Sequence, residues 1–353
     1  MIRESIRKLV DGRNLSNQEA RETMKEIMLG EATDAQIGSF LTALRIKGET
    51  IDEIAAFASV MREFCHNITP KVDGRLLDIV GTGGDQVDTF NISTAAIFVT
   101  SGAGVSIAKH GNRSVSSKCG SADVLQKLGL NLNMAPEAVE RSIEEVGLGF
   151  MFAPAFHPAM KHAVGPRKEL GIRTIFNTLG PLTNPAGANA QLLGVYDPGL
   201  TEPLAHALGR LGCEEAIVVH GLDGLDEIST LGPTRITWLK DGEVSTIETV
   251  PGDFGLRQAQ PEDVRGTNPE ESAELTFKII KGIYGLDDPR TEIVLANSAA
   301  GIVVAGEADD FLHGMELSRE SIESGTAYEK LRALIKASGG DLSTLEEMET
   351  RHG

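Results

Sequence analysis

A glycine-rich segment carries the sharpest chemical signal in this sequence. Gly81, Gly83 and Gly84 lie in the stretch GTGGD, which follows the apolar run LLDIV at 76–80 and precedes NIST at 91–94. Glycines allow positive φ and a close approach of backbone N–H groups to an anion, and a strand, a turn and a helix in that order are typical of phosphate binding. The spacing matches neither GxGxxG nor GxxxxGK(S/T), which excludes the dinucleotide and P-loop interpretations. A tight turn without a ligand is the alternative.

A second segment, KHGNRSVSSK at 109–118, follows the next predicted strand and is rich in hydrogen-bond donors. It combines three cationic side chains, one amide and three hydroxyls. Ligands of α/β proteins bind at the carboxyl ends of strands, so we expect this segment to face an anion. A solvated polar loop is the alternative, and His110 taken alone would be structural or merely exposed more often than functional.

Adjacent carboxylates follow a third predicted strand. Asp226 and Glu227 end the stretch DGLDE, shortly after the apolar run AIVV at 216–219. Mg²⁺ prefers hard oxygen ligands and commonly binds through one or two carboxylates together with substrate phosphates. These two acids, with a weak contribution from the Ser93 hydroxyl, therefore fit a magnesium site. An exposed acidic turn is the alternative in a chain that has 51 Asp and Glu residues.

Arg167 is the fourth candidate, because its planar guanidinium suits a carboxylate. Lys168 and Glu169 lie beside it, so an ordinary charge cluster on a helix surface is an equally good interpretation. The glycine turn, the basic segment and the acidic pair each follow a predicted strand. If those strands share one sheet, the three segments converge on a single phosphate-rich site assisted by a metal ion.

The elements that must position these residues change character at Pro70. Before it, three capping boxes predict successive amphipathic helices: Ser16 with Glu19, Thr33 with Gln36, and Thr50 with Glu53. After it, short apolar runs alternate with helical patterns, which predicts an α/β fold with a largely parallel sheet. Strands are expected at 76–80, 105–108, 148–152, 191–196 and 216–219, with a hairpin at 236–247. Helices are expected at 94–101, 121–128, 136–146 and 200–211 and over most of 270–347.

Charge and composition limit the function. The 353 residues include 33 Lys and Arg against 51 Asp and Glu, a net charge of −18 that disfavours nucleic-acid binding. Three cysteines without a CxxC pair fit neither a disulfide framework nor a zinc site, which favours a reducing compartment. No apolar run has the length of a signal-peptide core or of a membrane span. We therefore expect a cytoplasmic protein that binds neither membranes nor nucleic acid.

The order of six motifs resembles that of the anthranilate phosphoribosyltransferase family. These motifs are GTGGD, NIST, KHGNRSVSSKCGSADVL, HPAMK, GPLTNP and DGLDE. They lie between about residues 76 and 235, and the chain length and helical N-terminal region extend the resemblance over essentially the whole chain. The resemblance implies transfer of a phosphoribosyl group from 5-phosphoribosyl 1-diphosphate (PRPP) to the amine of anthranilate, in tryptophan biosynthesis, with Mg²⁺. The products would be N-(5-phosphoribosyl)anthranilate and diphosphate.

The resemblance also implies a role for each matching residue. PRPP would be bound by Gly81, Gly84, Asp85, Thr89, Asn91, Ile92, Ser93, Thr94, Lys109, His110, Gly111, Asn112, Arg113, Ser114, Val115, Ser116, Ser117 and Ser121. Anthranilate would be bound by Gly81, Asn112 and Arg167, with His110 beside it as the one candidate for a catalytic residue. Magnesium would be held by Ser93, Asp226 and Glu227. The chain departs from many relatives at Gln86, where they have glycine.

The implied family fold is a small all-helical domain joined to a larger α/β domain with a central, mostly parallel sheet. We expect the helical domain to comprise residues 1–72 together with 166–189, a proline-containing segment with little strand patterning. The α/β domain would then comprise 73–165 and 190–353. The family resemblance also implies a homodimer formed through the helical domains.

Two other functions stay open. A pyrimidine-nucleoside phosphorylase shares the fold and attacks the same sugar carbon with phosphate, although those enzymes have KxSGR where this chain has KHGNR at 109–113 and extend further at the C-terminus. A noncatalytic nucleic-acid-binding relative would need a basic surface, which the net charge of −18 opposes.

Overall fold

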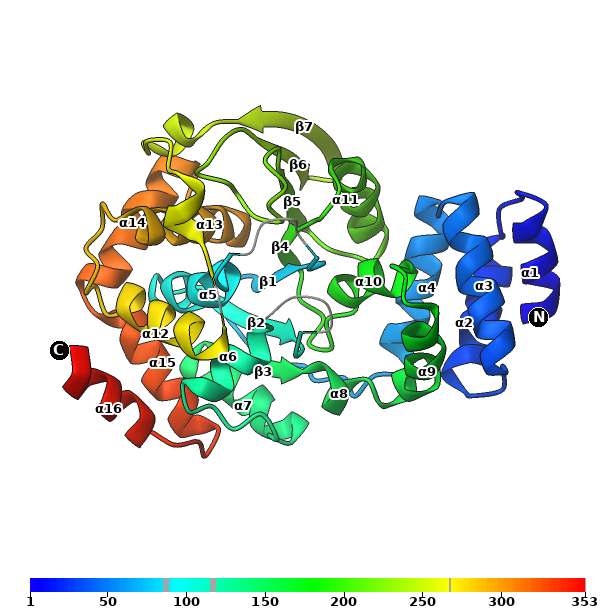
Figure 1. Cartoon of the computed structure of the whole chain (residues 1–353), viewed down its shortest axis with the longest axis horizontal. Coiled ribbons are helices and arrows are strands. Elements are labelled where there is room, and N and C mark those ends of the chain that lie inside the picture. The colour runs from blue at the N-terminus through cyan, green and yellow to red at the C-terminus, as the bar shows by residue number, and fades with distance from the viewer. Residues whose placement is uncertain (85–88, 115–118, 267, 353) are drawn as a thin grey trace.

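The computed structural model describes residues 1–84, 89–114, 119–266 and 268–352. Figure 1 shows a bundle of N-terminal helices at one end of the molecule and a larger body of helices around a sheet at the other. The bundle consists of α1 (Ile2–Val10), α2 (Asn17–Met28), α3 (Asp34–Lys47) and α4 (Ile51–Glu63). A helical part and a larger α/β part are the predicted fold class, which is therefore confirmed.

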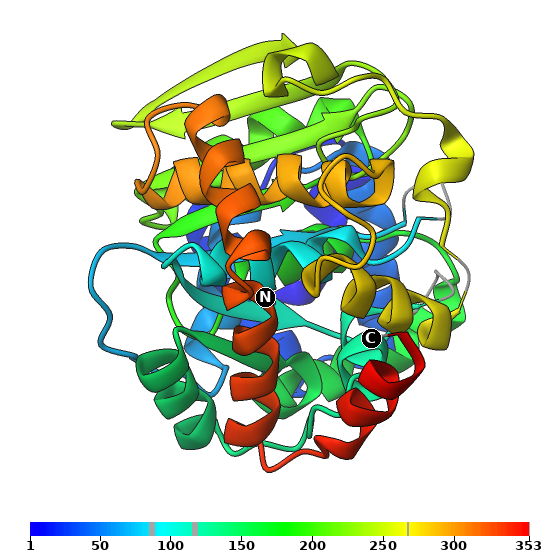
Figure 2. The same ribbon diagram turned by 90° about the vertical axis from the view of Figure 1, so that its left-hand side faces the viewer.

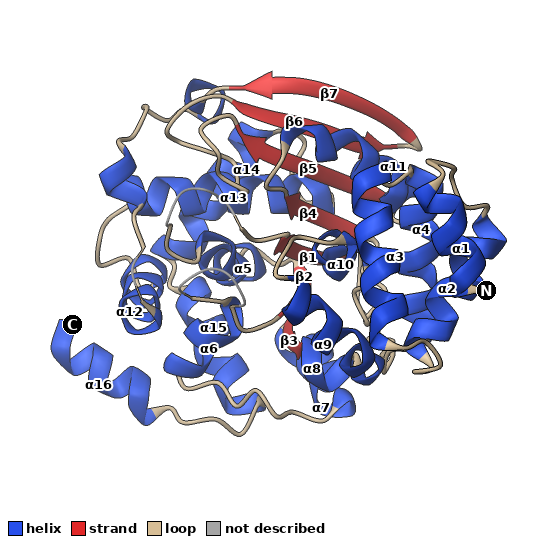
Figure 3. Cartoon of the chain, turned by 45° about the vertical axis from the view of Figure 1, so that its right-hand side comes forward, coloured by secondary structure: helices blue, strands red, loops and turns tan. Residues whose placement is uncertain are grey.

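Within the described residues, seven strands form one sheet in the order β3-β2-β1-β4-β5-β6-β7 (Figure 3). The pairs from β3 to β5 are parallel, and β6 and β7 are antiparallel. The carboxyl ends of the five parallel strands consequently meet at one edge. The strands are β1 (Leu76–Gly81), β2 (Ser106–Gly111), β3 (Leu148–Phe152), β4 (Ala190–Gly194), β5 (Glu215–Gly221), β6 (Thr234–Lys240) and β7 (Glu243–Thr249).

All the predicted strands are found, with small shifts at their ends. The shift with the greatest consequence for the candidate site is at β2, which continues to Gly111 instead of ending at Ala108. The predicted hairpin is β6 and β7, and its turn residues Asp241 and Gly242 have φ of 52° and 80°. Two successive positive φ values are typical of the turn type that matches the twist of a two-residue hairpin.

Helices cover both faces of the sheet. Leu192 and Ile217 belong to the core formed with α5 and α13, whereas Leu193 and Val218 belong to the core of the N-terminal bundle. Neighbouring residues of a strand point to opposite faces, so the sheet is buried on both sides. Figure 2 looks onto the C-terminal helices, coloured from yellow to red, which lie in front of the sheet. The helices after the bundle are α5 (Ile92–Gly102), α6 (Ser121–Lys127), α7 (Pro136–Val146), α8 (Ala153–Phe156), α9 (Lys161–Leu170), α10 (Ile175–Leu179), α11 (Thr201–Arg210), α12 (Pro269–Ile280), α13 (Pro289–Ala305), α14 (Phe311–Glu323), α15 (Thr326–Ala337) and α16 (Ser343–His352).

Between β3 and β4 the chain returns to the N-terminal bundle. α9 packs against α2 and α3, and α10 packs against α3 and α4. The buried side chains of Phe176 and Leu179 join the core of the bundle. In Figure 1, α9 and α10 lie between the bundle and the sheet. This stretch therefore links the two parts of the molecule through apolar contacts.

Two further features of the structure concern its cysteines and the length and polarity of its helices. Cys65 and Cys213 are free cysteines, the first half-buried and the second buried. In the part of the chain that the structure describes, every helix is too short or too polar to cross a membrane.

The three predicted capping boxes are present. At the starts of α2, α3 and α4, the Ser or Thr side chain accepts from the third helical N–H, and the Glu or Gln side chain there accepts from the cap residue's N–H. These reciprocal bonds satisfy backbone donors that a helix start would leave unpaired. The local sequence therefore fixes where α2, α3 and α4 begin.

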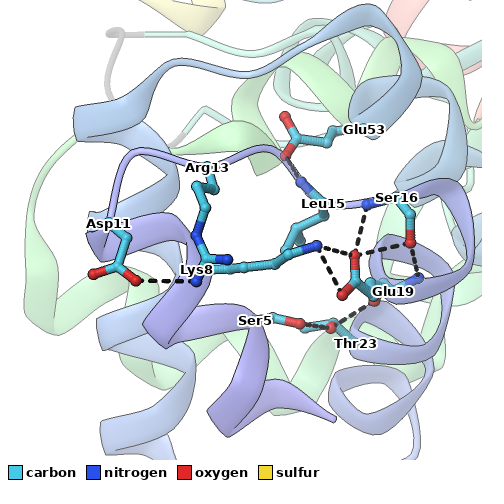
Figure 4. Close-up of polar contacts among 9 residues, drawn as sticks. All are labelled: Ser5, Lys8, Asp11, Arg13, Leu15, Ser16, Glu19, Thr23 and Glu53. Carbon is cyan, nitrogen blue, oxygen red and sulfur yellow. Dashed lines mark hydrogen bonds and ion pairs between the residues drawn. The ribbon is translucent and has the colours of Figure 1, made fainter.

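The two capping glutamates, Glu19 and Glu53, differ in burial. Glu19 of α2 accepts from Ser16 N–H and pairs with Lys8, and both charged side chains of that pair are about 30% exposed (Figure 4). Glu53 of α4 has a fully buried side chain, which pairs with Lys47 at 2.7 Å and accepts from the N–H of Leu15 at 2.8 Å. Glu53 therefore joins the end of α3, the start of α4 and the connection between α1 and α2.

We expect Glu53→Ala to destabilise the protein far more than Glu19→Ala. Removing one partner of a buried ion pair leaves the other charge uncompensated and costs about 3–5 kcal/mol. Loss of an exposed cap and ion pair costs about 1 kcal/mol. Urea unfolding of the two variants measures the difference. Equal losses of unfolding free energy would show that Glu53 is merely another cap.

Candidate active site

The glycine turn after β1 lies against the acidic segment after β5. Gly83 and Gly84 have φ of 66° and 79°, a region that favours glycine. The N–H of Gly83 donates to Asp226 Oδ2 at 3.1 Å. A Cβ atom on Gly81 would lie only 2.7 Å from the same oxygen. Glycine at this position therefore lets the turn and the acidic segment meet.

The first turn of α5 holds the second acid. Glu227 Oε1 accepts from the Ser93 N–H at 3.1 Å and from the Ser93 hydroxyl at 2.6 Å. The N-terminus of a helix stabilises negative charge through its unpaired N–H groups and its dipole. Asn91, the cap residue of α5, has a buried Oδ1 atom without a partner in the described structure. Ser93, Asp226 and Glu227, the predicted metal ligands, are thus brought together.

Lys109 lies beneath these acids. Because β2 extends to Gly111, Lys109 is part of the strand, is 3% exposed, and donates through Nζ to the carbonyl oxygen of Ile79 at 2.6 Å. Burial lowers the pKa of Lys109, and the charges of Asp78 and Glu227 oppose that shift. Its ammonium group is directed into the sheet, where it partly compensates buried carboxylates.

Among the described residues of this region, carboxylates outnumber cations. Asp226 and Glu227 retain partial solvent access, yet the surrounding protein raises the pKa of both, and the charge of Asp226 raises that of Glu227 further. Burial also raises the pKa of Asp78 to about 6. In the described residues, the nearby cations that oppose these shifts include buried Lys109 and exposed Arg173. The site therefore carries an excess of negative charge that favours either a proton or a metal cation.

The donor set suits a hard divalent cation. Two carboxylates and one hydroxyl supply oxygen ligands, and the described residues hold no cluster of three His, Cys, Asp or Glu side chains that would form a metal cage on its own. Mg²⁺ is typically bound in this way, through one or two carboxylates, with substrate phosphates and water completing its shell.

The segment after β2 forms a polar cluster with the start of α6. Arg113 is paired with Asp123 at 2.8 Å and donates to Gln126 at 2.8 Å, and its side chain is 47% exposed. The carbonyl of Asn112 accepts from the Ser121 hydroxyl at 3.4 Å. The Asn91 amide donates to the carbonyl of Cys119 at 3.4 Å, which ties this cluster to the start of α5.

Other predicted PRPP residues have different surroundings. Ile92 and Thr94 are 1% and 2% exposed, so their side chains are part of the core. Thr89 forms an isolated bridge with Arg265. The N–H of Ser114 donates to Asp123 at 3.2 Å, and Gly111 packs against Ser121 and Phe150. Asp85, Val115, Ser116 and Ser117, together with Gln86, lie outside the described residues.

Arg167 is half-buried on α9 without a carboxylate partner among the described residues. Its guanidinium lies 5.3 Å from the centre of the Phe176 ring. Burial lowers the pKa of this arginine, and no described carboxylate opposes that effect. A partly desolvated guanidinium without an anion is suited to bind one. Among the described residues, no hydrogen bond or ion pair joins Arg167 to the glycine turn or to the acidic pair.

Sequence reasoning missed two connections made by the segment between β3 and β4. Asn184 donates to Asp78 at 2.8 Å and to the Ala108 carbonyl at 2.8 Å, which links this segment to β1 and β2. Arg173 donates to the Gly84 carbonyl and lies 4.2 Å from the centre of the Tyr196 ring. The sequence holds one indication of such a connection: Asp78 interrupts the apolar run LLDIV, and a buried aspartate needs a polar partner.

A pair of buried histidines lies next to this network. The N–H of His110 donates to Asp78 at 3.2 Å, and the His110 ring lies 4.9 Å from that of His157. Burial lowers the pKa of His110 to about 3 and that of His157 to about 4. The Nε2 atoms of both rings are buried without a partner in the described structure. Both imidazoles are therefore neutral at pH 7.

We expect His157→Gln to make the protein less sensitive to acid. The folded-state pKa of His157 lies below its ordinary value of 6.5, so between pH 6.5 and about 4 the unfolded chain binds a proton that the folded chain does not. Stability is therefore lost as the pH falls through this window, by on the order of 3 kcal/mol in total. Urea unfolding at a series of pH values measures this loss.

The matched control is His206→Gln, because the His206 side chain is 43% exposed on α11. It should leave the acid dependence of the wild-type protein unchanged. The account of His157 would be wrong if His157→Gln lost stability on acidification as steeply as the wild-type protein.

Comparisons with known proteins show the family to which the fold belongs. The family described as "Glycosyl transferase family, a/b domain" matches residues 73–328, and its helical bundle domain matches residues 3–65. An anthranilate phosphoribosyltransferase of Acetivibrio thermocellus is 51% identical over 343 residues, which cover 97% of this chain and 98% of the relative. One from Methanocorpusculum labreanum is 52% identical, covering 96% of this chain and 99% of the relative.

Solved structures give the same match. The crystal structure of anthranilate phosphoribosyltransferase from Thermus thermophilus has a TM-score of 0.88 and 42% identity, covering 95% of this chain and 99% of that one. The enzyme from Saccharomyces cerevisiae in complex with PRPP and Mg has a TM-score of 0.88 and 30% identity, covering 96% of this chain and 98% of that one. A further yeast structure, with a TM-score of 0.86 and 29% identity, contains 4-fluoroanthranilate and covers 96% of this chain and 98% of that one.

Proposed function

The chain belongs to the anthranilate phosphoribosyltransferase family, and on this premise we propose that the carboxyl edge of its sheet is the site of phosphoribosyl transfer. The chain is a glycosyltransferase of tryptophan biosynthesis that transfers the 5-phosphoribosyl group of PRPP to the amine of anthranilate. The main support for this assignment is the excess of negative charge at Asp226 and Glu227. These two acids lie beside the glycine turn and the start of α5.

Asp226 and Glu227, with the Ser93 hydroxyl, would hold Mg²⁺. When bound there, Mg²⁺ would neutralise charge on the diphosphate as it leaves. The Ser93 hydroxyl at present donates to Glu227, so this contact would rearrange on metal binding. Lys109 stays beneath the acids and limits the repulsion between them.

The glycine turn and the start of α5 would hold the diphosphate. Backbone N–H groups of the turn and of the first turn of the helix are donors suited to phosphate oxygens. Gly84 belongs to the turn, and Asn91 is the cap residue of α5. The bond from Asn91 to Cys119 joins the start of α5 to the cluster of Asn112, Arg113 and Ser121. We assign PRPP binding to these groups and to the remaining residues that match the family motif.

Arg167 would bind the anthranilate carboxylate, with Gly81 and Asn112 on the other side of the acceptor. The aromatic amine of anthranilate is neutral at pH 7, so attack on the sugar needs neither a strong base nor a covalent nucleophile. His110 is neutral as well and would act by contact with the acceptor. Holding the two substrates in line contributes on the order of 7–11 kcal/mol to such a reaction.

The domain division follows from the same premise. Residues 1–72 with 166–189 would form the helical domain, and 73–165 with 190–353 the α/β domain; the packing of α9 and α10 on the bundle supports this. Movement of the helical domain would carry Arg167 toward the glycine turn and exclude water, which competes with anthranilate for the sugar. Homodimer formation through the bundle and a cytoplasmic location stay predictions.

The substrate pair tests the function. We expect the protein to consume anthranilate in the presence of PRPP and Mg²⁺, which is followed by loss of anthranilate fluorescence. Release of thymine from thymidine and phosphate, without loss of anthranilate, would instead identify a pyrimidine-nucleoside phosphorylase. Tight DNA binding at physiological salt without transferase activity would identify a nucleic-acid-binding relative.

We expect Arg167→Ala to raise the KM for anthranilate at least about tenfold, because a charge-assisted hydrogen bond contributes about 1.5–3 kcal/mol. The KM for PRPP should change by less than about twofold, since Arg167 is not assigned to PRPP. Lys168→Ala, which removes the neighbouring exposed cation on α9, is the control and should change neither value. The opposite pattern, with PRPP affected and anthranilate spared, would remove Arg167 from the acceptor site.

A further inference from the structure

A buried asparagine lies behind the acidic segment. Asn297 is in the middle of α13, a helix that packs against α5 and against β1, β4 and β5. It is 0% exposed, and the flanking residues Leu295, Ala296, Ala299 and Ala300 are also buried. Burying an amide in apolar surroundings costs free energy unless its polar atoms are hydrogen-bonded. The partners of Asn297 therefore indicate what its amide does.

Both polar atoms of this amide bind the backbone of a single residue. Asn297 Oδ1 accepts from the N–H of Ile228 at 2.9 Å, and Asn297 Nδ2 donates to the carbonyl of Ile228 at 3.0 Å. Nδ2 also donates to the carbonyl of Ile293 at 2.8 Å, one turn back in the same helix. The side chain thus holds Ile228 as a neighbouring strand would, by its donor and its acceptor at once.

Ile228 directly follows Glu227, so this pairing fixes the backbone that carries the two acids. Gly83 holds the Asp226 carboxylate from the turn after β1, and Ser93 holds the Glu227 carboxylate from α5. Asn297 adds the third support, from α13, and it is the one of these three that binds the main chain of the segment. The direction in which Asp226 and Glu227 leave the backbone therefore depends on Asn297.

The next residue of α13, Ser298, is also buried but makes no hydrogen bond to the acidic segment among the described residues, so it serves as a comparison for Asn297. Ser298 is also 0% exposed, and its hydroxyl donates to the carbonyl of Val294, one turn back, at 2.7 Å. The hydroxyl reaches the Ala96 carbonyl of α5 at 3.4 Å but makes no hydrogen bond with residues 223–228 in the described structure. Asn297 makes the same bond within the helix and, in addition, crosses to Ile228.

We propose that Asn297 is a positioning residue for the divalent-metal site, holding Asp226 and Glu227 in the arrangement that binds the ion. This inference rests on the proposed function, in which these two acids are the metal ligands. Residues that orient metal ligands typically contribute 10–100-fold to metal affinity. Loss of the bonds to Ile228 should therefore weaken metal binding while the anthranilate site keeps its affinity.

Asn297→Ser isolates the bonds to Ile228. A serine hydroxyl can still donate to the Ile293 carbonyl, as that of Ser298 does to Val294, but it is too short to pair with Ile228. Mn²⁺ binding in the presence of diphosphate reports on the site without turnover, when it is measured in electron paramagnetic resonance as the loss of free-ion signal beyond that caused by the same diphosphate without protein. We expect about tenfold weaker Mn²⁺ binding, a similar rise in the Mg²⁺ concentration for half-maximal rate, and a KM for anthranilate within about twofold of wild type.

Two further variants distinguish the inference about Asn297 from the proposed metal site. Ser298→Ala, at the next buried position of α13, should bind Mn²⁺ like the wild-type protein. Asp226→Asn with Glu227→Gln should lose Mn²⁺ binding; if it does not, or if the wild-type protein binds none, the proposed metal site itself is wrong. If that pair behaves as expected and Asn297→Ser still binds like the wild-type protein, the inference about Asn297 is overturned and the metal site stands.

Asn297→Asp separates positioning from general stability. It retains an acceptor for the Ile228 N–H, so its Mn²⁺ affinity should lie between those of the wild type and Asn297→Ser. It also buries a carboxylate, so its melting temperature should be the lowest of the set. Affinities that instead follow the melting temperatures across these variants would overturn the inference, because they would mean that Asn297 acts only through the stability of the fold.

Discussion

The excess of negative charge at the carboxyl edge of the sheet is the constraint on which this site depends. Asp226 and Glu227 are held close together by the glycine turn and by the start of α5, and Lys109 beneath them compensates only part of their charge. Folding such a group of acids without a counter-charge is costly, as their raised pKa values indicate. In the proposed function, a divalent cation would supply the missing positive charge and would in turn bind the anionic substrate.

The sheet makes this arrangement possible through its backbone. Gly81 of β1 pairs with Gly194 of β4 in the parallel register, and the carbonyl of Asp226 packs so closely on Gly194 that a side chain there would collide with it. The N–H of Thr82 donates to the Gly194 carbonyl at 2.9 Å, which holds the glycine turn beside β4. Three segments that are far apart in the sequence thus meet because two neighbouring strands end in residues without side chains.

The sequence predicts the parts of this site that local patterns encode. Capping boxes locate α2, α3 and α4 of the bundle. Because parallel strands end at one edge, the glycine turn and Asp226 could be expected to meet. The inward position of Lys109 could not be expected, because it depends on the extension of β2 to Gly111, and a pattern of apolar residues locates the end of a strand poorly. The bond from Asn184 to Asp78 joins residues 106 positions apart, and no local pattern indicates it.

The most direct test of this account is the position of the metal ion. In crystals grown with PRPP and Mn²⁺, we expect the strongest anomalous difference peak to lie between the carboxylate oxygens of Asp226 and Glu227 and the diphosphate, at metal–oxygen distances of about 2.0–2.3 Å. A peak elsewhere, with the diphosphate away from the glycine turn and the two acids without an ion, would contradict the account.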